Sequence, residues 1–182
     1  MLLDLADLPE RGTIDTDVCI VGAGAAGISL ARSLLPSGLN ICLLESGGFD
    51  HEAAVTDLGS GENRGQTYYD LIDSRLRFFG GTTNIWGGRC VPLDAEDFEK
   101  KSWVPGSGWP IDAEDLDEGY RYAHEQLELG PPIDQDTAWQ RLRARKPALL
   151  GEAFSTSFWY FDEQAERFNA NRCQDLFKAS NV

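Results

Sequence analysis

Residues 17–31, DVCIVGAGAAGISLA, decide the fold of this chain. A short run rich in β-branched residues ends in the glycine-rich turn at 22–27, and the apolar residues after it recur at helical spacing. Pro36 and Gly38 end that helix, and a second apolar run follows at 40–44. Strand, glycine-rich turn, helix and strand in this order predict the βαβ unit of a parallel sheet.

The first glycine block, Gly22 to Gly27, has the G-x-G-x-x-G spacing of a dinucleotide-binding turn. Gly22 permits the tight turn, Gly24 lets a pyrophosphate approach the backbone, and Gly27 lets the helix pack closely. The Glu45 carboxylate at the end of the second strand is suited to an adenosine ribose, and it would repel a 2′-phosphate. A turn without a ligand is disfavoured, because strand, helix and terminal acid are all present. The predicted cofactor contacts here are Gly22, Ala23, Gly24, Ala26, Gly27, Glu45 and Ser46.

A second glycine block lies within residues 75–93, RLRFFGGTTNIWGGRCVPL. Bare backbone N–H groups and threonine hydroxyls suit a flat ring system with a phosphate, and Arg77 supplies positive charge. From these residues alone, a surface loop without a ligand is an equal alternative. The predicted cofactor contacts in this block are Arg77, Gly80, Gly81, Thr82, Thr83, Asn84, Trp86, Gly87 and Gly88.

Composition narrows the class of protein. The chain has 182 residues, with 30 acidic and 16 basic side chains and a net charge of −14. Its 42% hydrophobic and 25% charged content excludes a disordered acidic tail or a collagen-like repeat. The acidic balance argues against nucleic-acid binding, and the basic cluster at 141–146 is too small to reverse that. No apolar run reaches the roughly 20 residues that a membrane-spanning helix needs.

Cysteine and histidine placement yields no catalytic or metal-ligating residue. The four cysteines form no CxxC pair and the N-terminus lacks a signal-peptide pattern, which favours a cytoplasmic location. The acids at 112–118 are expected to begin a helix with Asp112 as its N-cap rather than to bind metal. His124 is expected to pack on that helix, and His51 to lie in a loop. A further helix is predicted over residues 163–179.

The chain resembles the glucose–methanol–choline (GMC) family of flavin oxidoreductases. The resemblance lies in residues 17–31, in LLESGG at 43–48 and in RFFGGTTNIWGGRCVPLDAEDF at 77–98. Residues 107–130, SGWPIDAEDLDEGYRYAHEQLELG, are similar to its sugar-dehydrogenase members. The resemblance implies FAD with its ADP half on the first glycine block and Glu45. It places the pyrophosphate and flavin along Arg77 and the 80–88 loop. It also implies oxidation of a CH–OH group of a sugar or other alcohol, with hydride transfer to flavin N5.

The sequence departs from the family pattern in two places, which concern the attachment of FAD and the catalytic histidine. Ile85 stands where some members carry the histidine that attaches FAD covalently, so non-covalent FAD is expected. The family's catalytic histidine lies near the C-terminus of a much longer chain and has no counterpart among these residues. The resemblance therefore implies that this chain alone is inactive, and that the rest of a longer chain or a second subunit completes the site.

The sequence predicts an α/β fold: an incomplete Rossmann-like FAD-binding βαβ unit of a parallel sheet, followed by loop and helical segments. Residues 14–98 are expected to form the FAD-binding domain, and residues 99–182 connecting helices and the start of a truncated substrate-side region. Two alternatives stay open: a non-catalytic FAD-binding fragment or subunit, and an NAD-dependent Rossmann enzyme. The second is disfavoured, because residues 49–110 do not continue the strand–helix alternation.

Overall fold

The computed structural model describes residues 1–10, 12–148, 154, 156–164 and 166–182. The chain forms two compact units. Unit 1 contains Met1–Trp86 together with Gln164–Val182, and unit 2 contains Gly87–Glu163. Unit 1 is therefore discontinuous in sequence, because unit 2 is inserted between its two stretches. The two units are defined by compactness and do not test the predicted functional domains. The predicted boundary between an FAD-binding domain ending at residue 98 and a substrate-side region starting at residue 99 stays a prediction.

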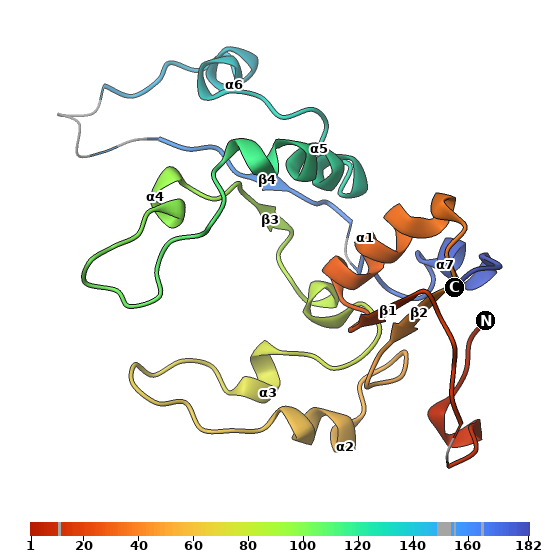
Figure 1. Ribbon diagram of the computed structural model, residues 1–182. Helices are drawn as coiled ribbons and strands as arrows, with labels where there is room; N and C mark the ends of the chain where they lie inside the picture. Colours follow the sequence, from red (N-terminus) through yellow and green to blue (C-terminus); the bar gives the residue numbers. More distant parts are fainter. Residues whose placement is uncertain (11, 149–153, 155, 165) are drawn as a thin grey trace. The chain divides into compact units, whose positions relative to one another are not determined.

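Unit 1 holds the βαβ unit and several short helices (Figure 1). Its strands and α-helices are β1 Val18–Val21, α1 Ala25–Leu34, β2 Ile41–Leu44, α2 Ala53–Thr56, α3 Leu71–Ser74 and α7 Gln174–Lys178. Its 3-10 turns are η1 Leu5–Asp7, η2 Leu35–Ser37, η3 Asp57–Gly59 and η4 Gly81–Asn84. Unit 2 contains β3 Arg89–Cys90, α4 Ala95–Phe98, η5 Glu114–Leu116, α5 Asp117–Gln126, α6 Gln135–Arg141 and β4 Tyr160–Phe161.

The predicted βαβ unit is present. Strands β1 and β2 pair in parallel, with Val18 opposite Ile41 and Val21 opposite Leu44. Helix α1 lies against the strands and buries Ile28 completely. A Cβ on Gly27 would lie 2.0 Å from the Gly22 carbonyl oxygen, so the helix packs as closely as its glycine allows. The α/β class and the Rossmann-like unit are confirmed.

The C-terminal segment, residues 166–182, returns to the βαβ unit. The Asn181 carbonyl accepts a hydrogen bond from the Ile41 amide at 2.7 Å, and its side-chain amide donates to the Leu39 carbonyl at 2.9 Å. Phe168, Cys173 and Leu176 are buried. The core of unit 1 is thus completed by residues far from β1 in sequence.

The helix predicted over 163–179 is wrong in extent. Residue 165 lies outside the described residues, and from 166 the chain forms turns until α7 begins at Gln174. The Asn169 side-chain oxygen accepts the Arg172 amide at 3.0 Å, and its amide donates to Glu166 at 2.9 Å. Asparagine side chains compete with helix hydrogen bonds in this way, and they favour turns.

Unit 2 contains the helix predicted after Asp112. The Asp112 carboxylate accepts the Glu114 amide at 3.0 Å and the Asp115 amide at 3.2 Å, so it caps the η5 turn that leads into α5. His124 is buried on α5, with its Nδ1 atom 2.8 Å from the Gly130 carbonyl oxygen and its ring against Tyr160. The predicted packed role of His124 is confirmed. Strands β3 and β4 pair antiparallel in the same unit.

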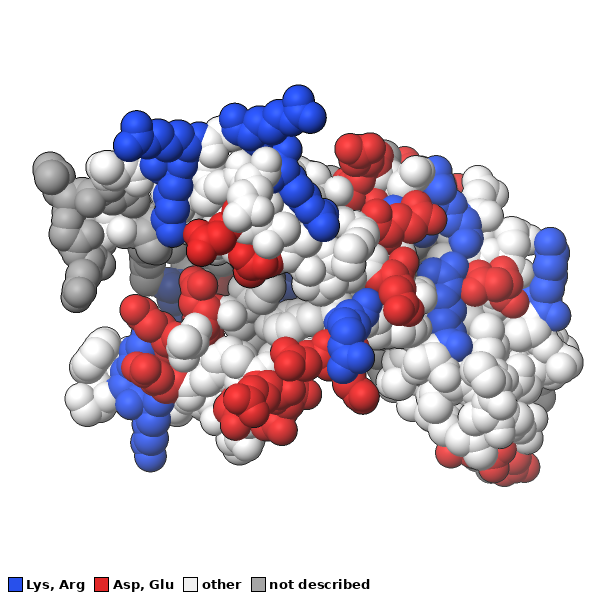
Figure 2. Space-filling view, turned by 90° about the horizontal axis from the view of Figure 1, so that it is seen from above, with Lys and Arg blue, Asp and Glu red and all other residues white. Residues whose placement is uncertain are grey.

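Charge is dispersed over the surface. On the face shown in Figure 2, acidic side chains occur in several groups with Lys and Arg side chains among them. Among the described residues, no helix is long and apolar enough to cross a membrane. In the same part of the chain, no group of three or more His, Cys, Asp or Glu side chains is placed to hold a metal ion.

Candidate cofactor-binding site

The first glycine block and the Gly80–Gly81 part of the second block meet inside unit 1. Gly24 and Gly80 form an isolated parallel β-bridge, and the Gly80 amide donates to the Ala23 carbonyl at 2.7 Å. A Cβ on Gly81 would lie 3.5 Å from the Gly24 Cα atom. The structure therefore brings together Gly24 and Gly80, two predicted site residues that are 56 positions apart in sequence.

Open space lies beside the first block. A Cβ built on Gly24 meets nothing within 4 Å. Helix α1 starts at the next residue, with no side-chain cap and no acid in its first turn. Its amide groups are thus free of a capping side chain, and the positive end of the helix dipole favours an anion there. These features fit the pyrophosphate of a dinucleotide.

Glu45 is held firmly at the end of β2. Its Oε2 atom accepts the Ala23 amide at 2.8 Å. Its Oε1 atom accepts the Ser46 amide at 2.8 Å, the Gly47 amide at 3.2 Å and the Ser46 hydroxyl at 3.1 Å. The carboxylate therefore ties β2 to the first glycine turn. Oε2 has one of these donors and Oε1 has three, so Oε2 keeps capacity for a ribose hydroxyl.

The second block uses most of its polar groups to hold its own loop. The Thr83 hydroxyl donates to the Gly80 carbonyl at 2.6 Å, and the Thr82 hydroxyl accepts the Leu76 amide at 3.1 Å. The Asn84 amide donates to the Phe79 carbonyl at 2.9 Å. The Asn84 Oδ1 atom is buried without a hydrogen-bond partner in the described structure. A buried acceptor of this kind fits a donor supplied by a ligand.

Arg77 lies between the loop after β2 and η3. Its Cδ atom is 3.8 Å from the position of a Cβ on Gly59. Its Nε atom is buried and has no hydrogen-bond partner among the described residues, and no ion pair joins Arg77 to a carboxylate in that part of the chain. Its charge is therefore available to a phosphate group.

Trp86, Gly87 and Gly88 fall at the junction of the two units. Trp86 is the last residue of the first stretch of unit 1, whereas Gly87 and Gly88 belong to unit 2. The Gly88 carbonyl accepts the Asp162 amide at 2.7 Å, beside the β3–β4 pair. This contact gives Gly88 a role in packing the chain around Asp162. A cofactor role for all three residues stays a prediction.

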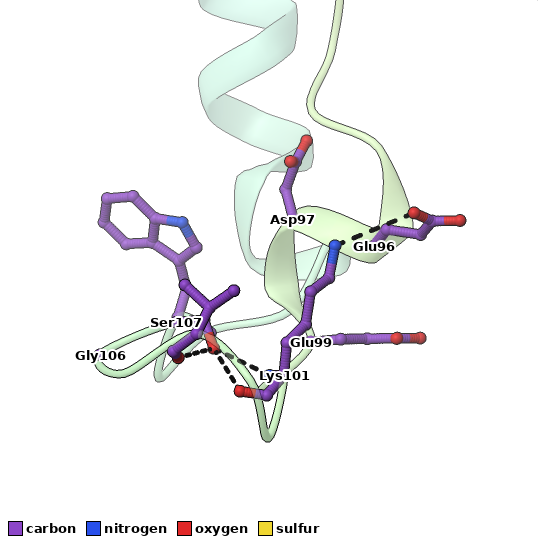
Figure 3. Close-up of a pocket in the computed structure, with 9 residues that line it drawn as sticks. Glu96, Asp97, Glu99, Lys101, Gly106 and Ser107 are labelled. Carbon is purple, nitrogen blue, oxygen red and sulfur yellow. Dashed lines mark hydrogen bonds and ion pairs between the residues drawn. The ribbon is translucent and has the colours of Figure 1, made fainter. Parts of the chain in front are cut away.

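Each unit also has a cavity that the sequence did not indicate. In unit 1, a cavity of about 520 Å³ is lined by His51, Thr56, Ile85 and neighbouring side chains, with His51 Nε2 3.0 Å from the Thr56 hydroxyl. Figure 3 shows the cavity of about 450 Å³ in unit 2. There, Ser107 donates to the Lys101 carbonyl at 3.1 Å, and Lys101 lies 3.9 Å from Glu96. These contacts stabilise the loop itself.

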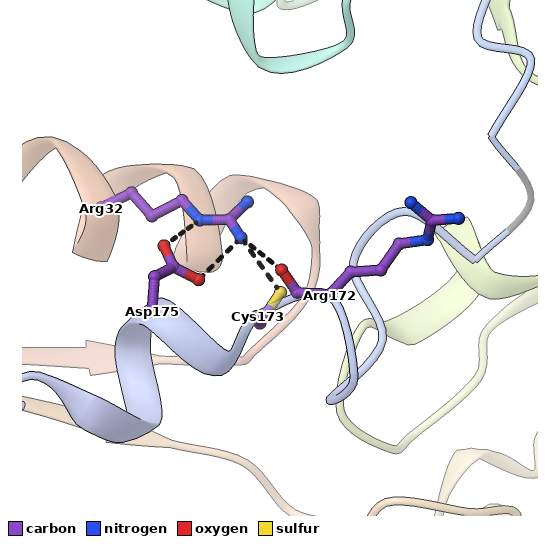
Figure 4. A network of polar contacts seen from close by, with 4 residues as sticks. All are labelled: Arg32, Arg172, Cys173 and Asp175. Carbon is purple, nitrogen blue, oxygen red and sulfur yellow. Dashed lines mark hydrogen bonds and ion pairs between the residues drawn. The ribbon is translucent and has the colours of Figure 1, made fainter.

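A polar network joins α1 to α7 and the turn before it (Figure 4). Arg32 donates two hydrogen bonds to Asp175, at 2.7 and 3.0 Å, and a third to the Arg172 carbonyl at 3.0 Å. The hydrogen bond from Arg32 lowers the pKa of Asp175. Burial raises the pKa of Cys173 to about 11, so this thiol stays protonated near neutral pH. Sequence reasoning missed this network.

Comparison with known families agrees with the site. The family model described as FAD dependent oxidoreductase (DAO) matches residues 17–176, which span β1 to α7 and include every predicted cofactor contact. FAD is therefore the cofactor, as the sequence predicted. The match covers most of the chain, and this protein belongs to the DAO family of FAD-dependent oxidoreductases.

Proposed function

We propose that FAD binds non-covalently in unit 1, against the Gly22–Gly27 block and the Gly80–Gly81 part of the second block, in an oxidoreductase that acts on the CH–OH group of a sugar or other alcohol. The observation that carries the proposal is the contact between Gly24 and Gly80, with open space beside Gly24. The resemblance of residues 17–31, 43–48 and 77–98 to the GMC family supports the substrate class.

The proposal assigns a role to backbone groups and to side chains around the cofactor. The α1 N-terminus and the bare backbone at Gly24 bind the pyrophosphate. Glu45 Oε2 accepts a hydrogen bond from the adenosine ribose, and Arg77 neutralises phosphate charge. Bound FAD supplies the hydride acceptor. Ile85 has no nucleophilic atom, so it cannot form a bond to the flavin, which supports non-covalent binding.

No side chain of this chain is proposed as the catalytic base. His124 is buried, and its ring is hydrogen-bonded to the Gly130 carbonyl. The His51 ring is hydrogen-bonded to the Thr56 hydroxyl, whereas a catalytic histidine is usually oriented by a carboxylate. We propose that the chain alone does not turn over alcohols, and that the remainder of a longer chain or a second subunit supplies the base. A cytoplasmic location remains a prediction from the cysteine pattern.

The test separates cofactor binding from chemistry. The purified protein is precipitated with acid, and the flavin is expected in the supernatant; flavin in the pellet would show a covalent link. In a second experiment, the FAD-loaded protein is mixed anaerobically with a panel of sugars and alcohols, and the flavin absorption band is followed. Bleaching by the chain alone would overturn the assignment of its histidines as structural. If no sugar or alcohol bleaches the flavin, even after the proposed remainder of the chain or second subunit is added, the result would favour a non-catalytic FAD-binding subunit.

A further inference from the structure

The C-terminal segment packs directly behind the second glycine block. The Phe168 carbonyl oxygen lies 2.7 Å from the position of a Cβ on Gly80. The Phe177 ring packs on Phe79, with ring centroids 5.2 Å apart, and on Phe49, at 5.6 Å. Residues 166–182 thus form the wall against which Gly80 is seated while its amide bonds to Ala23.

A bidentate ion pair attaches this segment to α1. Arg32 and Asp175 are 143 positions apart in sequence. The Arg32 side chain is 17% exposed, and the Asp175 side chain is 45% exposed. Paired hydrogen bonds of this geometry are stronger and more specific than a single contact to lysine. The pair therefore fixes where α7, and with it Phe177, lies relative to the βαβ unit.

We propose that Arg32 and Asp175 are positioning residues for FAD binding: their ion pair holds residues 166–182 so that Phe168 and Phe177 seat the second glycine block against Gly24. Arg32 lies in the last turn of α1, eight residues after Gly24 and about 12 Å along the helix, so it acts without touching the pyrophosphate. The inference rests on the proposed placement of FAD against the two blocks.

The test compares Arg32→Met, Arg32→Lys and a matched control, Arg64→Met. Arg64 forms an exposed ion pair with Glu62 in unit 1. Within the described part of the chain, no hydrogen bond or ion pair joins Arg64 to residues 166–182. FAD affinity is measured by titrating the apo-protein at a temperature where every variant is fully folded. Hydrogen exchange of the Gly80 amide in the apo-protein is measured in parallel.

Arg32→Met is expected to weaken FAD binding about 2- to 30-fold, the range for residues that couple to a site without contacting the ligand. It should also speed exchange of the Gly80 amide. Arg32→Lys should lie between Arg32→Met and the unaltered protein, because it keeps the charge and loses the bidentate geometry. Arg64→Met should change neither quantity.

A lowered melting temperature in Arg32→Met, with unchanged FAD affinity and unchanged Gly80 exchange, would overturn the inference and leave the pair a purely structural contact. If Arg32→Met does not fold, Asp175→Asn removes the same pair with little change in shape and is judged by the same two measurements. The variant Gly24→Val tests the placement of FAD independently of the role of the ion pair. Retained FAD binding in Gly24→Val refutes the placement, whereas Gly80 exchange in the apo-protein still decides whether the ion pair seats the loop.

Discussion

Gly24 and Gly80 lie against each other, yet the space beside each is used differently. At Gly24, φ is −81°, which any residue adopts, and an added Cβ would meet nothing within 4 Å. At Gly80, φ is +90°, and an added Cβ would lie 2.6 Å from Asn84 Nδ2 and 2.7 Å from the Phe168 carbonyl oxygen. The first glycine leaves a space that the protein does not fill. The second makes room for the protein's own chain.

This difference separates a glycine required for a ligand from a glycine required for the fold. Both belong to glycine-rich blocks, and the sequence alone assigns both to the cofactor. The contacts indicate that a side chain at position 24 should harm binding and spare folding. A side chain at position 80 should harm folding first.

The largest effect is expected from Gly80→Ala. The left-handed backbone and the overlap with Asn84 and Phe168 together should lower the free energy of unfolding of unit 1 by about 2–5 kcal/mol. Urea unfolding followed by far-UV circular dichroism measures this. A variant as stable as the unaltered protein would show that the loop can move away from Phe168, and the contrast with Gly24 would fail.

Gly24→Val should leave unfolding nearly unchanged and weaken FAD binding by at least about 100-fold, or about 2.7 kcal/mol. The valine side chain would occupy the space proposed for the pyrophosphate. Flavin content after purification and FAD titration of the apo-protein are the measurements. Full flavin content in a folded Gly24→Val protein would contradict the placement of the cofactor.

Glu45→Gln sharpens the comparison, because Glu45 serves both the fold and the proposed ligand. The amide keeps one acceptor oxygen, so it cannot hold Ala23 on one side and Ser46 with Gly47 on the other. Loss of a hydrogen bond to a charged group costs about 1.5–3 kcal/mol, which corresponds to roughly 10- to 100-fold in FAD affinity. FMN, which lacks the adenosine ribose, should lose less affinity than FAD; equal losses would remove Glu45 from the ribose.

The smallest effect concerns pH. The hydrogen bond from Arg32 lowers the pKa of Asp175 from its ordinary value of 3.8, so the ionised form stabilises unit 1. This stabilisation is fully present above the ordinary value, and it is lost as the pH falls through the lowered one. Asp175→Asn should therefore be less stable than the unaltered protein at neutral pH, by at most about 1 kcal/mol because the pair is partly exposed. The gap should close in acid, and a gap that persists there would assign the effect to packing.

Local patterns predicted the part of the fold that depends on local contacts. The β-branched run before Gly22, the helical spacing after Gly27 and the stop at Pro36 predicted β1, α1 and β2. Helix α1 begins at Ala25, inside the glycine-rich turn and three residues before the predicted start. Asp112 predicted the start of the α5 region for the same reason, because a capping side chain acts within three residues.

Contacts between distant residues were not predictable in this way. No periodicity in residues 166–182 shows that Asp175 binds Arg32 or that Phe177 packs on Phe79. The helix predicted over 163–179 failed in this segment, because the Asn169 side chain holds a turn. At the site, glycine spacing predicted which residues gather, and only the three-dimensional contacts distinguish Gly24 from Gly80.

The discontinuity of unit 1 has a consequence for the order of events during synthesis. The segment β1–α1–β2 and the Gly80–Gly81 part of the second glycine block are complete once Trp86 has been added, but Gln164–Val182 follow only after all of unit 2. At about 5–20 residues per second, roughly 5–20 s pass before Asp175 and Phe177 exist. During that interval Arg32 has no Asp175 to bind, and Phe79 lacks the Phe177 ring. Joining the two stretches also closes a long loop, which slows folding relative to the βαβ unit. A nascent chain can thus form its first glycine turn early, whereas Gly80 acquires its final seat late.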